Sequence, residues 1–334
     1  MSTEQLAAAF PCMAADLDRL RDRMADTRQV EGWPDLTEMV GHLLDGVPKL
    51  VRPGLALMSA YIVSDPRRPV PDRVIEAAVA TEHVHVGTLC HDDVMDEAAT
   101  RRARPSVNAR WGNSMAILSG DYHLGTAAIM AARLGPATST IIAELFQTLC
   151  RGQMIETVDR YNVNRSEESY IESISAKTAM LLSSSCRLGA LHASSDADVI
   201  DALARFGIEF GIAFQINDDV LDLTRSEAEL GKPPGNDIFE GVYTLPVLRA
   251  IGRGTELHGL LSPPVTRADA TRAIELVVAS GAIEEASILG RGWFESAIRS
   301  LPSLPGREQQ IEALVAFARE LLMAFPDPVV SASA

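Results

Sequence analysis

Two segments of the chain share the pattern Asp-Asp-x-x-Asp, and their aspartates are Asp92, Asp93, Asp96, Asp218, Asp219 and Asp222. On a helix, the first and last aspartate of each motif lie one turn apart on the same face. Both motifs follow strongly apolar stretches, where unpaired carboxylates are costly, so they fit poorly as solvated helix faces. A hard cation would offset the repulsion, and Mg²⁺ binds carboxylates together with water and substrate phosphates. The motifs therefore predict Mg²⁺-dependent phosphate chemistry.

Basic residues elsewhere in the chain could hold the same phosphates, namely Lys49, Arg52, Arg101, Arg102, Lys177 and Lys232. Arginine binds phosphate oxygens in bidentate fashion, and lysine supplies a compact positive charge. Taken singly, each would be an ordinary surface cation, so the prediction depends on their combination with the aspartates. His85 precedes Asp92 by seven residues, two helical turns along the same face, and we expect it to contact the ligand.

Helices are expected to position these residues. Apolar residues recur at three- and four-residue intervals, which predicts helices over 73–96, 114–134, 138–158, 168–192 and 198–222. Turn residues such as Gly135-Pro136 separate them. No internal repeat or linker is evident, so we expect one all-α domain over residues 1–334.

Composition narrows the class of protein further. The 334 residues are 47% hydrophobic and carry a formal net charge of −15, which argues against nucleic-acid binding. The sequence has no run of about eighteen consecutive apolar residues, so a transmembrane span is not expected. The first residues do not resemble a signal peptide. The four cysteines are widely scattered, and their spacing suggests neither a zinc site nor a disulfide framework. This fits a reducing compartment, so we expect a cytoplasmic protein.

Four segments together closely resemble the trans-prenyl diphosphate synthases, also called polyprenyl synthetases. They are PKLVRP with its leading Gly46 (46–53), the segment 82–122 around the first motif, KTAMLLSSSCRLGA (177–190), and the segment 214–246 around the second motif. They occur in the family's order and approximate spacing. The resemblance covers roughly residues 40–250.

The resemblance implies a bundle of antiparallel helices around a deep central cavity, usually assembled as a homodimer. It also implies that isopentenyl diphosphate condenses with an allylic diphosphate to give a linear all-trans product. Asp92, Asp96 and Asp218 would bind Mg²⁺, and Asp93, Asp219 and Asp222 would support them.

The remaining site residues would divide between the two substrates. The allylic diphosphate would be held by Arg101, Lys177 and Lys232. Isopentenyl diphosphate would be held by Lys49, Arg52, His85 and Arg102. Thr178 and Gln215 match family positions near the reacting carbons.

Product length is expected to depend on two small residues, Gly87 and Thr88, which lie about a turn before Asp92. In the family, bulky aromatic residues near these positions stop growth at farnesyl length. The resemblance therefore implies a geranylgeranyl product or a longer one, with a long-chain polyprenyl product favoured.

The chain departs from the family pattern at Val242, where a lysine is usual, and at His123, where an aliphatic residue is common. Two alternatives stay open. One is a class I terpene cyclase or an irregular coupling enzyme, although the Ser and Glu of the cyclase motif Asn-Asp-x-x-Ser-x-x-x-Glu are replaced here by Leu221 and Arg225. The other is a non-catalytic subunit of a heteromeric synthase, for which Val242 is the support.

Overall fold

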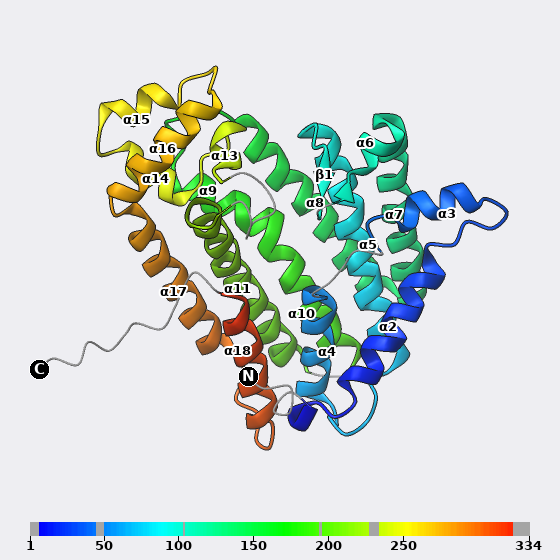
Figure 1. Cartoon of the computed structure of the whole chain (residues 1–334). Helices are drawn as coiled ribbons and strands as arrows, with labels where there is room; N and C mark the ends of the chain where they lie inside the picture. Colours follow the sequence, from blue (N-terminus) through cyan, green and yellow to red (C-terminus); the bar gives the residue numbers. More distant parts are fainter. Residues whose placement is uncertain (1–6, 45–49, 103, 194–195, 227–233, 323–334) are drawn as a thin grey trace, which may run out of the picture. The chain divides into compact units, whose positions relative to one another are not determined.

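The computed structural model describes residues 7–44, 50–102, 104–193, 196–226 and 234–322. Its regular structure is almost entirely helical (Figure 1), which confirms the all-α prediction. The five predicted ranges match helices to within two residues at each end. These helices are α5 (Asp72–Met95), α7 (Asn113–Leu134), α8 (Pro136–Val158), the consecutive α9 (Glu167–Ile174), η1 (Ser175–Ala179) and α10 (Met180–His192), and α11 (Ala197–Thr224).

The chain divides into two compact units, and the first comprises Met1–Gln147, Leu181–Gly207 and Ser300–Val315. Besides α5 and α7 it contains α2 (Met13–Thr27), α3 (Pro34–Gly41), α4 (Val51–Val63) and α6 (Val107–Trp111). A short antiparallel hairpin of β1 (Thr100–Arg101) and β2 (Arg104–Pro105) follows α5. These two strands are the only ones among the described residues.

Helices α5 and α7 pack with their backbones close together. A Cβ atom on Gly87 would lie 2.9 Å from the carbonyl oxygen of Gly120, so only glycine fits without a shift. His123 of α7 is fully buried beside them. Its Nδ1 lies 2.9 Å from Nδ1 of His83, and its Nε2 lies 3.1 Å from the carbonyl oxygen of Val40. His123, which stands where the family commonly has an aliphatic residue, therefore links α7 to α5 and α3.

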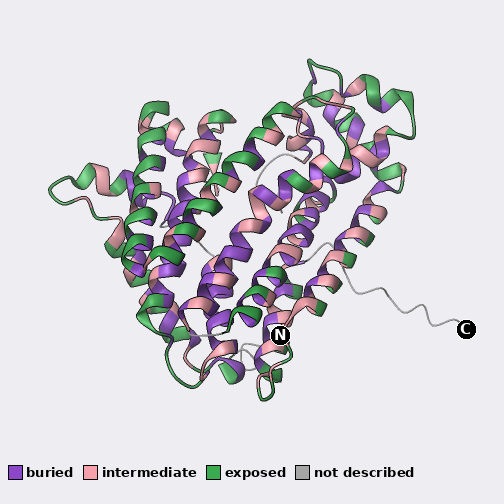
Figure 2. Ribbon diagram, turned by 180° about the vertical axis from the view of Figure 1, so that it is seen from behind, coloured by how far each residue is buried: buried purple, intermediate pink, exposed green. Residues whose placement is uncertain are grey.

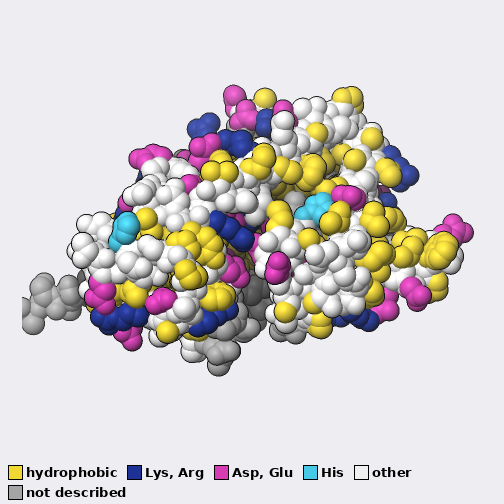
Figure 3. All heavy atoms as spheres, turned by 90° about the horizontal axis from the view of Figure 1, so that it is seen from above, with side chains coloured by type: hydrophobic (Ala, Val, Ile, Leu, Met, Phe, Trp, Pro, Cys, Tyr) yellow, Lys and Arg dark blue, Asp and Glu magenta, His cyan; other side chains and the backbone are white. Residues whose placement is uncertain are grey.

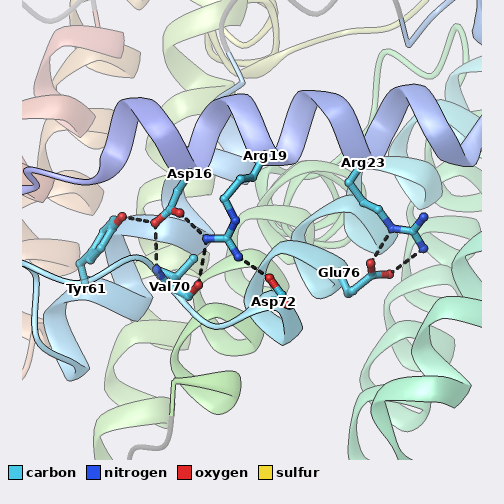
Figure 4. Close-up of polar contacts among 7 residues, drawn as sticks. All are labelled: Asp16, Arg19, Arg23, Tyr61, Val70, Asp72 and Glu76. Carbon is cyan, nitrogen blue, oxygen red and sulfur yellow. Dashed lines mark hydrogen bonds and ion pairs between the residues drawn. The ribbon is translucent and has the colours of Figure 1, made fainter.

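Helix α2 is joined to the rest of this unit by polar contacts, the most buried of which are those of Asp16 (Figure 4). The Asp16 carboxylate accepts hydrogen bonds from the Tyr61 hydroxyl and, at 2.9 Å, from the backbone N–H of Val70. Arg19 pairs with both Asp16 and Asp72. These contacts tie α2 to α4, to the start of α5 and to the segment between them.

The second unit comprises Thr148–Met180, Ile208–Arg299 and Ala316–Ala334. Its other helices are α13 (Asn236–Phe239), α14 (Leu245–Ile251), α15 (Thr255–Leu260), α16 (Arg267–Ala279), α17 (Ala282–Ser300) and the C-terminal part of α18 (Glu308–Leu321). Buried residues from these helices form apolar clusters around Tyr243 and Tyr170. Along several of the helices, the ribbon colours alternate between buried and exposed residues (Figure 2).

Candidate functional site

The first aspartate motif lies at the C-terminal end of α5, where the helix dipole is negative and carboxylates favour a nearby cation. Asp92 and Asp96 are half-buried, and the N–H of Asp96 donates to the carbonyl oxygen of Asp92 at 2.8 Å. The two residues therefore lie one turn apart, as their spacing predicts. Asp93 points inward and is fully buried.

Arg101 supplies the counter-charge for Asp93. The hairpin places the Arg101 Nε and Nη2 atoms 2.7 and 2.6 Å from Asp93 Oδ1. The second oxygen, Oδ2, is buried with no hydrogen-bond partner among the described residues. Burial raises the pKa of Asp93, although Arg101 opposes this shift. One carboxylate oxygen is thus left for a further ligand.

Three of the predicted phosphate-binding residues lie around one buried carboxylate, Glu82. Arg52 forms two hydrogen bonds with Glu82, from Nε to Oε2 at 2.8 Å and from Nη2 to Oε1 at 3.0 Å. Nη2 of Arg102 lies 3.5 Å from Nε2 of His85, and its Nη1 donates to the carbonyl oxygen of Leu43 at 2.9 Å. The structure therefore brings Arg52, His85 and Arg102 together.

The charges of this group shift one another. Burial would raise the pKa of Glu82, but Arg52 outweighs burial and lowers it to about 2. Burial, reinforced by the Arg52 charge, holds the pKa of His85 well below its usual range. This shift favours the neutral imidazole of His85.

The second motif lies on α11 in the second unit. Asp218 is exposed, whereas Asp219 and Asp222 are buried. The Tyr170 hydroxyl donates to Asp219 Oδ2 at 2.6 Å, and Nε2 of Gln215 donates to Oδ1 at 2.9 Å. Burial, aided by the charge of Asp237, raises the pKa of Asp219 to about 8 against these hydrogen bonds.

Lys177 and Thr178 lie in the π-helical turn η1, a local irregularity common at functional sites. The Thr178 hydroxyl donates to Oε1 of Gln215 at 2.7 Å, which links η1 to α11. The Lys177 ammonium lies 2.7 Å from Oε1 of Glu156. Thr178, Gln215 and Asp219 thus form one continuous chain of hydrogen bonds.

Two of the predicted cations, Lys49 and Lys232, lie outside the described residues. Gly87 faces the backbone of α7, so its described contacts are packing contacts. Thr88 is half-buried and donates to the carbonyl oxygen of His85 at 2.8 Å. Val242 is half-buried, and its backbone N–H donates to the carbonyl oxygen of Asp237.

Sequence reasoning missed four polar residues, which are Glu82, Glu156, Tyr170 and Asp237. Glu82 was the most detectable, because a glutamate three residues before His85 in an otherwise apolar segment requires a buried partner. The other three meet the site from separate helices, and spacing along one helix carries no information about them.

The carboxylates fit a hard divalent cation. Among the described residues, no three His, Cys, Asp or Glu side chains gather closely enough to hold a metal by themselves. Mg²⁺ commonly takes one or two carboxylates and completes its octahedron with water and phosphate oxygens. Within the first unit, the unpartnered Asp93 oxygen suits such partial coordination, and within the second unit the exposed Asp218 does.

Comparisons of the sequence and of the structure with known proteins find the same kind of relative. A sequence model of the Polyprenyl synthetase family matches residues 34–276. The nonaprenyl diphosphate synthase of Mycobacterium tuberculosis is 38% identical over 319 residues, 92% of each chain. Component 2 of the Geobacillus stearothermophilus heptaprenyl diphosphate synthase is 34% identical over 91% of this chain and 94% of its own. A geranylgeranyl pyrophosphate synthase from Corynebacterium glutamicum, solved with calcium and isoprenyl diphosphate, is similar with a TM-score of 0.78 and 34% identity, covering 94% and 96% of the two chains.

Proposed function

This chain belongs to the polyprenyl synthetase family, and from that premise we propose how its residues perform the reaction. The protein is a trans-prenyltransferase that condenses isopentenyl diphosphate with an allylic diphosphate. We propose that its product is a linear prenyl diphosphate of geranylgeranyl length or longer. The observation that carries this proposal is the group of Arg52, His85 and Arg102, which is a cationic site additional to the aspartate motifs. A cyclase acting on one diphosphate has no need of it.

In the proposed mechanism, each substrate has its own cations. Lys177, Arg101 and Lys232 hold the allylic diphosphate and stabilise its negative charge as it departs. Arg52, His85, Arg102 and Lys49 hold isopentenyl diphosphate. Its double bond attacks the allylic cation, and the departing diphosphate takes the proton that is lost. Apolar surroundings exclude the water that would otherwise quench the cation.

We assign Mg²⁺ to the aspartate motifs. Asp92, Asp96 and Asp218 would hold it, and the buried Asp93, Asp219 and Asp222 would support them. When bound, the metal supplies positive charge to the leaving diphosphate. The hydrogen bonds of Asp219 with Tyr170 and Gln215 support this assignment, because they fix the carboxylate before metal arrives.

The whole chain, residues 1–334, is proposed to act as one synthase domain in a cytoplasmic homodimer. No described helix is long and apolar enough to cross a membrane. The four cysteines form no disulfide among the described residues, which suits a reducing compartment. An apolar stripe on α7 supports the homodimer, because Leu118, Tyr122 and Ile129 are exposed at helical spacing. Acidic and basic side chains are intermixed on the face shown in Figure 3.

The decisive experiment supplies purified protein with isopentenyl diphosphate, Mg²⁺ and one primer at a time. Dimethylallyl, geranyl, farnesyl and geranylgeranyl diphosphates serve as primers, and the dephosphorylated products are sized. We expect linear alcohols longer than the primer and no turnover after chelation of the metal. Cyclic hydrocarbons as the sole products would refute the proposed reaction.

A second candidate function is that of one subunit in a heteromeric synthase. It is favoured by the relative named component 2 and by Val242 in place of the usual lysine. Under this alternative, the purified chain shows no Mg²⁺-dependent turnover with any primer. Activity of the chain alone excludes it.

A further inference from the structure

Glu82 is a buried charge that the proposed reaction does not use. Its side chain has no solvent exposure, and a glutamate in this position is rare without a partner. Its carboxylate bonds to Arg52 through both oxygens, at 2.8 and 3.0 Å. The Arg52 side chain is 16% exposed, so Glu82 is fully enclosed while part of Arg52 reaches the solvent.

The bonding pattern determines which arginine donors stay available. A guanidinium carries five N–H donors in one rigid plane. Glu82 takes the Nε–H and one N–H of Nη2, along a single edge. Within the described part of the chain, the two donors of Nη1 and the second donor of Nη2 have no hydrogen-bond partner, and they lie on the other sides of the plane. Fixing one edge therefore fixes the direction of the rest.

We infer that Glu82 is a positioning residue that orients Arg52 for the diphosphate of isopentenyl diphosphate, an inference that rests on the proposed function. Bidentate pairs of this kind restrict a guanidinium more than any single hydrogen bond does. The neighbouring backbone is also constrained, because Leu50 and Arg102 both adopt positive φ, 39° and 54°. Arg52 is held by Glu82, and Arg102 by the carbonyl oxygen of Leu43, before the ligand binds.

A purely electrostatic role for Glu82 predicts the opposite result of a substitution. If the carboxylate only reduced the positive charge near Arg52, its removal would strengthen attraction for an anion. If it orients Arg52, its substitution by glutamine weakens binding, because the amide oxygen can accept only one of the two arginine hydrogen bonds and the amide NH₂ group faces the other arginine donor. Since its pKa lies at about 2, Glu82 stays charged throughout the working pH range.

The test is steady-state kinetics of Glu82→Gln with each substrate varied in turn. We expect KM for isopentenyl diphosphate to rise roughly ten-fold or more, while KM for the allylic primer stays within about two-fold. Arg52→Lys keeps the charge but loses the fork, and we expect the same selective rise. If Glu82→Gln does not fold, Arg52→Lys still tests whether the two-pronged Arg52–Glu82 pair is needed for binding of isopentenyl diphosphate.

Glu76→Gln is the matched control. Glu76 lies on the same helix and also accepts two hydrogen bonds from one arginine, Arg23 (Figure 4), far along α5 from His85. We expect it to leave both KM values unchanged. An unchanged or lowered KM for isopentenyl diphosphate in Glu82→Gln, or an equal rise for both substrates, overturns the inference. A wild-type protein without turnover would instead count against the proposed function.

Discussion

The hydrogen bonds of Asp219 hold its carboxylate in a fixed orientation within the second aspartate motif. Tyr170 and Gln215 bond to different oxygens of its carboxylate. We expect Tyr170→Phe to raise the Mg²⁺ concentration for half-maximal activity by roughly ten-fold, since partners of metal ligands typically contribute 10–100-fold in affinity. Activity against Mg²⁺ concentration measures it. Tyr243→Phe, which also loses a buried hydroxyl bond, to Leu261, is the control. Equal shifts in both variants would show a general loss of stability.

Product length is expected to depend on Gly87 and Thr88, and of these two positions Thr88 is the one that can be tested by a larger side chain. Thr88 is half-buried one turn before Asp92, whereas a side chain at Gly87 would collide with the backbone of Gly120. Thr88→Phe is therefore the informative change, and we expect it to shorten the product by at least one isoprene unit. Thr88→Val loses only the hydroxyl and should leave the length unchanged. Products of wild-type length from Thr88→Phe would contradict a role for this position.

At the scale of elements, spacing along one helix was predictable and contacts between helices were not. The position of Asp92 and Asp96 one turn apart followed from the α-helical repeat. The π-helical turn at Lys177 did not, because its extra residue depends on how η1 packs against Gly152. The pairing of Arg52 with Glu82 joins α4 to α5, and the register between two helices is set by packing that no single segment encodes.

The attachment of α2 gives a prediction at this scale. Asp16→Ala leaves the Tyr61 hydroxyl and the Val70 N–H without their acceptor. We expect the free energy of unfolding to fall by about 3 kcal/mol, as is usual when one partner of a buried charged network is removed. Urea denaturation measures it. Asp18→Ala removes an exposed pair with Arg21 on the same helix and should cost under about 1 kcal/mol. Similar losses in the two variants would contradict a special role for Asp16.

For the whole molecule, the exposed stripe of α7 predicts the oligomeric state. Leu118 has 58% exposure, and a large apolar residue in such a stripe is best explained by a covering surface. We expect the wild-type chain to be a dimer in light scattering and Leu118→Glu to be a monomer. Val278→Glu changes a comparably exposed residue of α16 and should remain dimeric. A monomeric wild-type chain, or a dimeric Leu118→Glu, would exclude this interface.

The stability of the whole molecule should also depend on pH through its buried histidines. Burial lowers the pKa of His83 and of His192 to about 4, and that of His123 to about 3. The unfolded chain takes up these protons near pH 6.5. Between about pH 6.5 and pH 4 the unfolded state therefore binds more protons than the folded state, and folding stability falls as the pH falls.

His192 allows this effect to be isolated. Its Nε2 lies 2.9 Å from the Thr138 hydroxyl, a contact that glutamine can retain without titrating. Each such histidine contributes about 1.4 kcal/mol per pH unit within the window. We therefore expect His192→Gln to gain about 2 kcal/mol relative to the wild type between pH 7.5 and pH 5 in urea denaturation. His258→Gln, at an exposed position, should follow the wild-type curve. If His192→Gln also ran parallel to the wild type, His192 would have to be protonated in the folded protein.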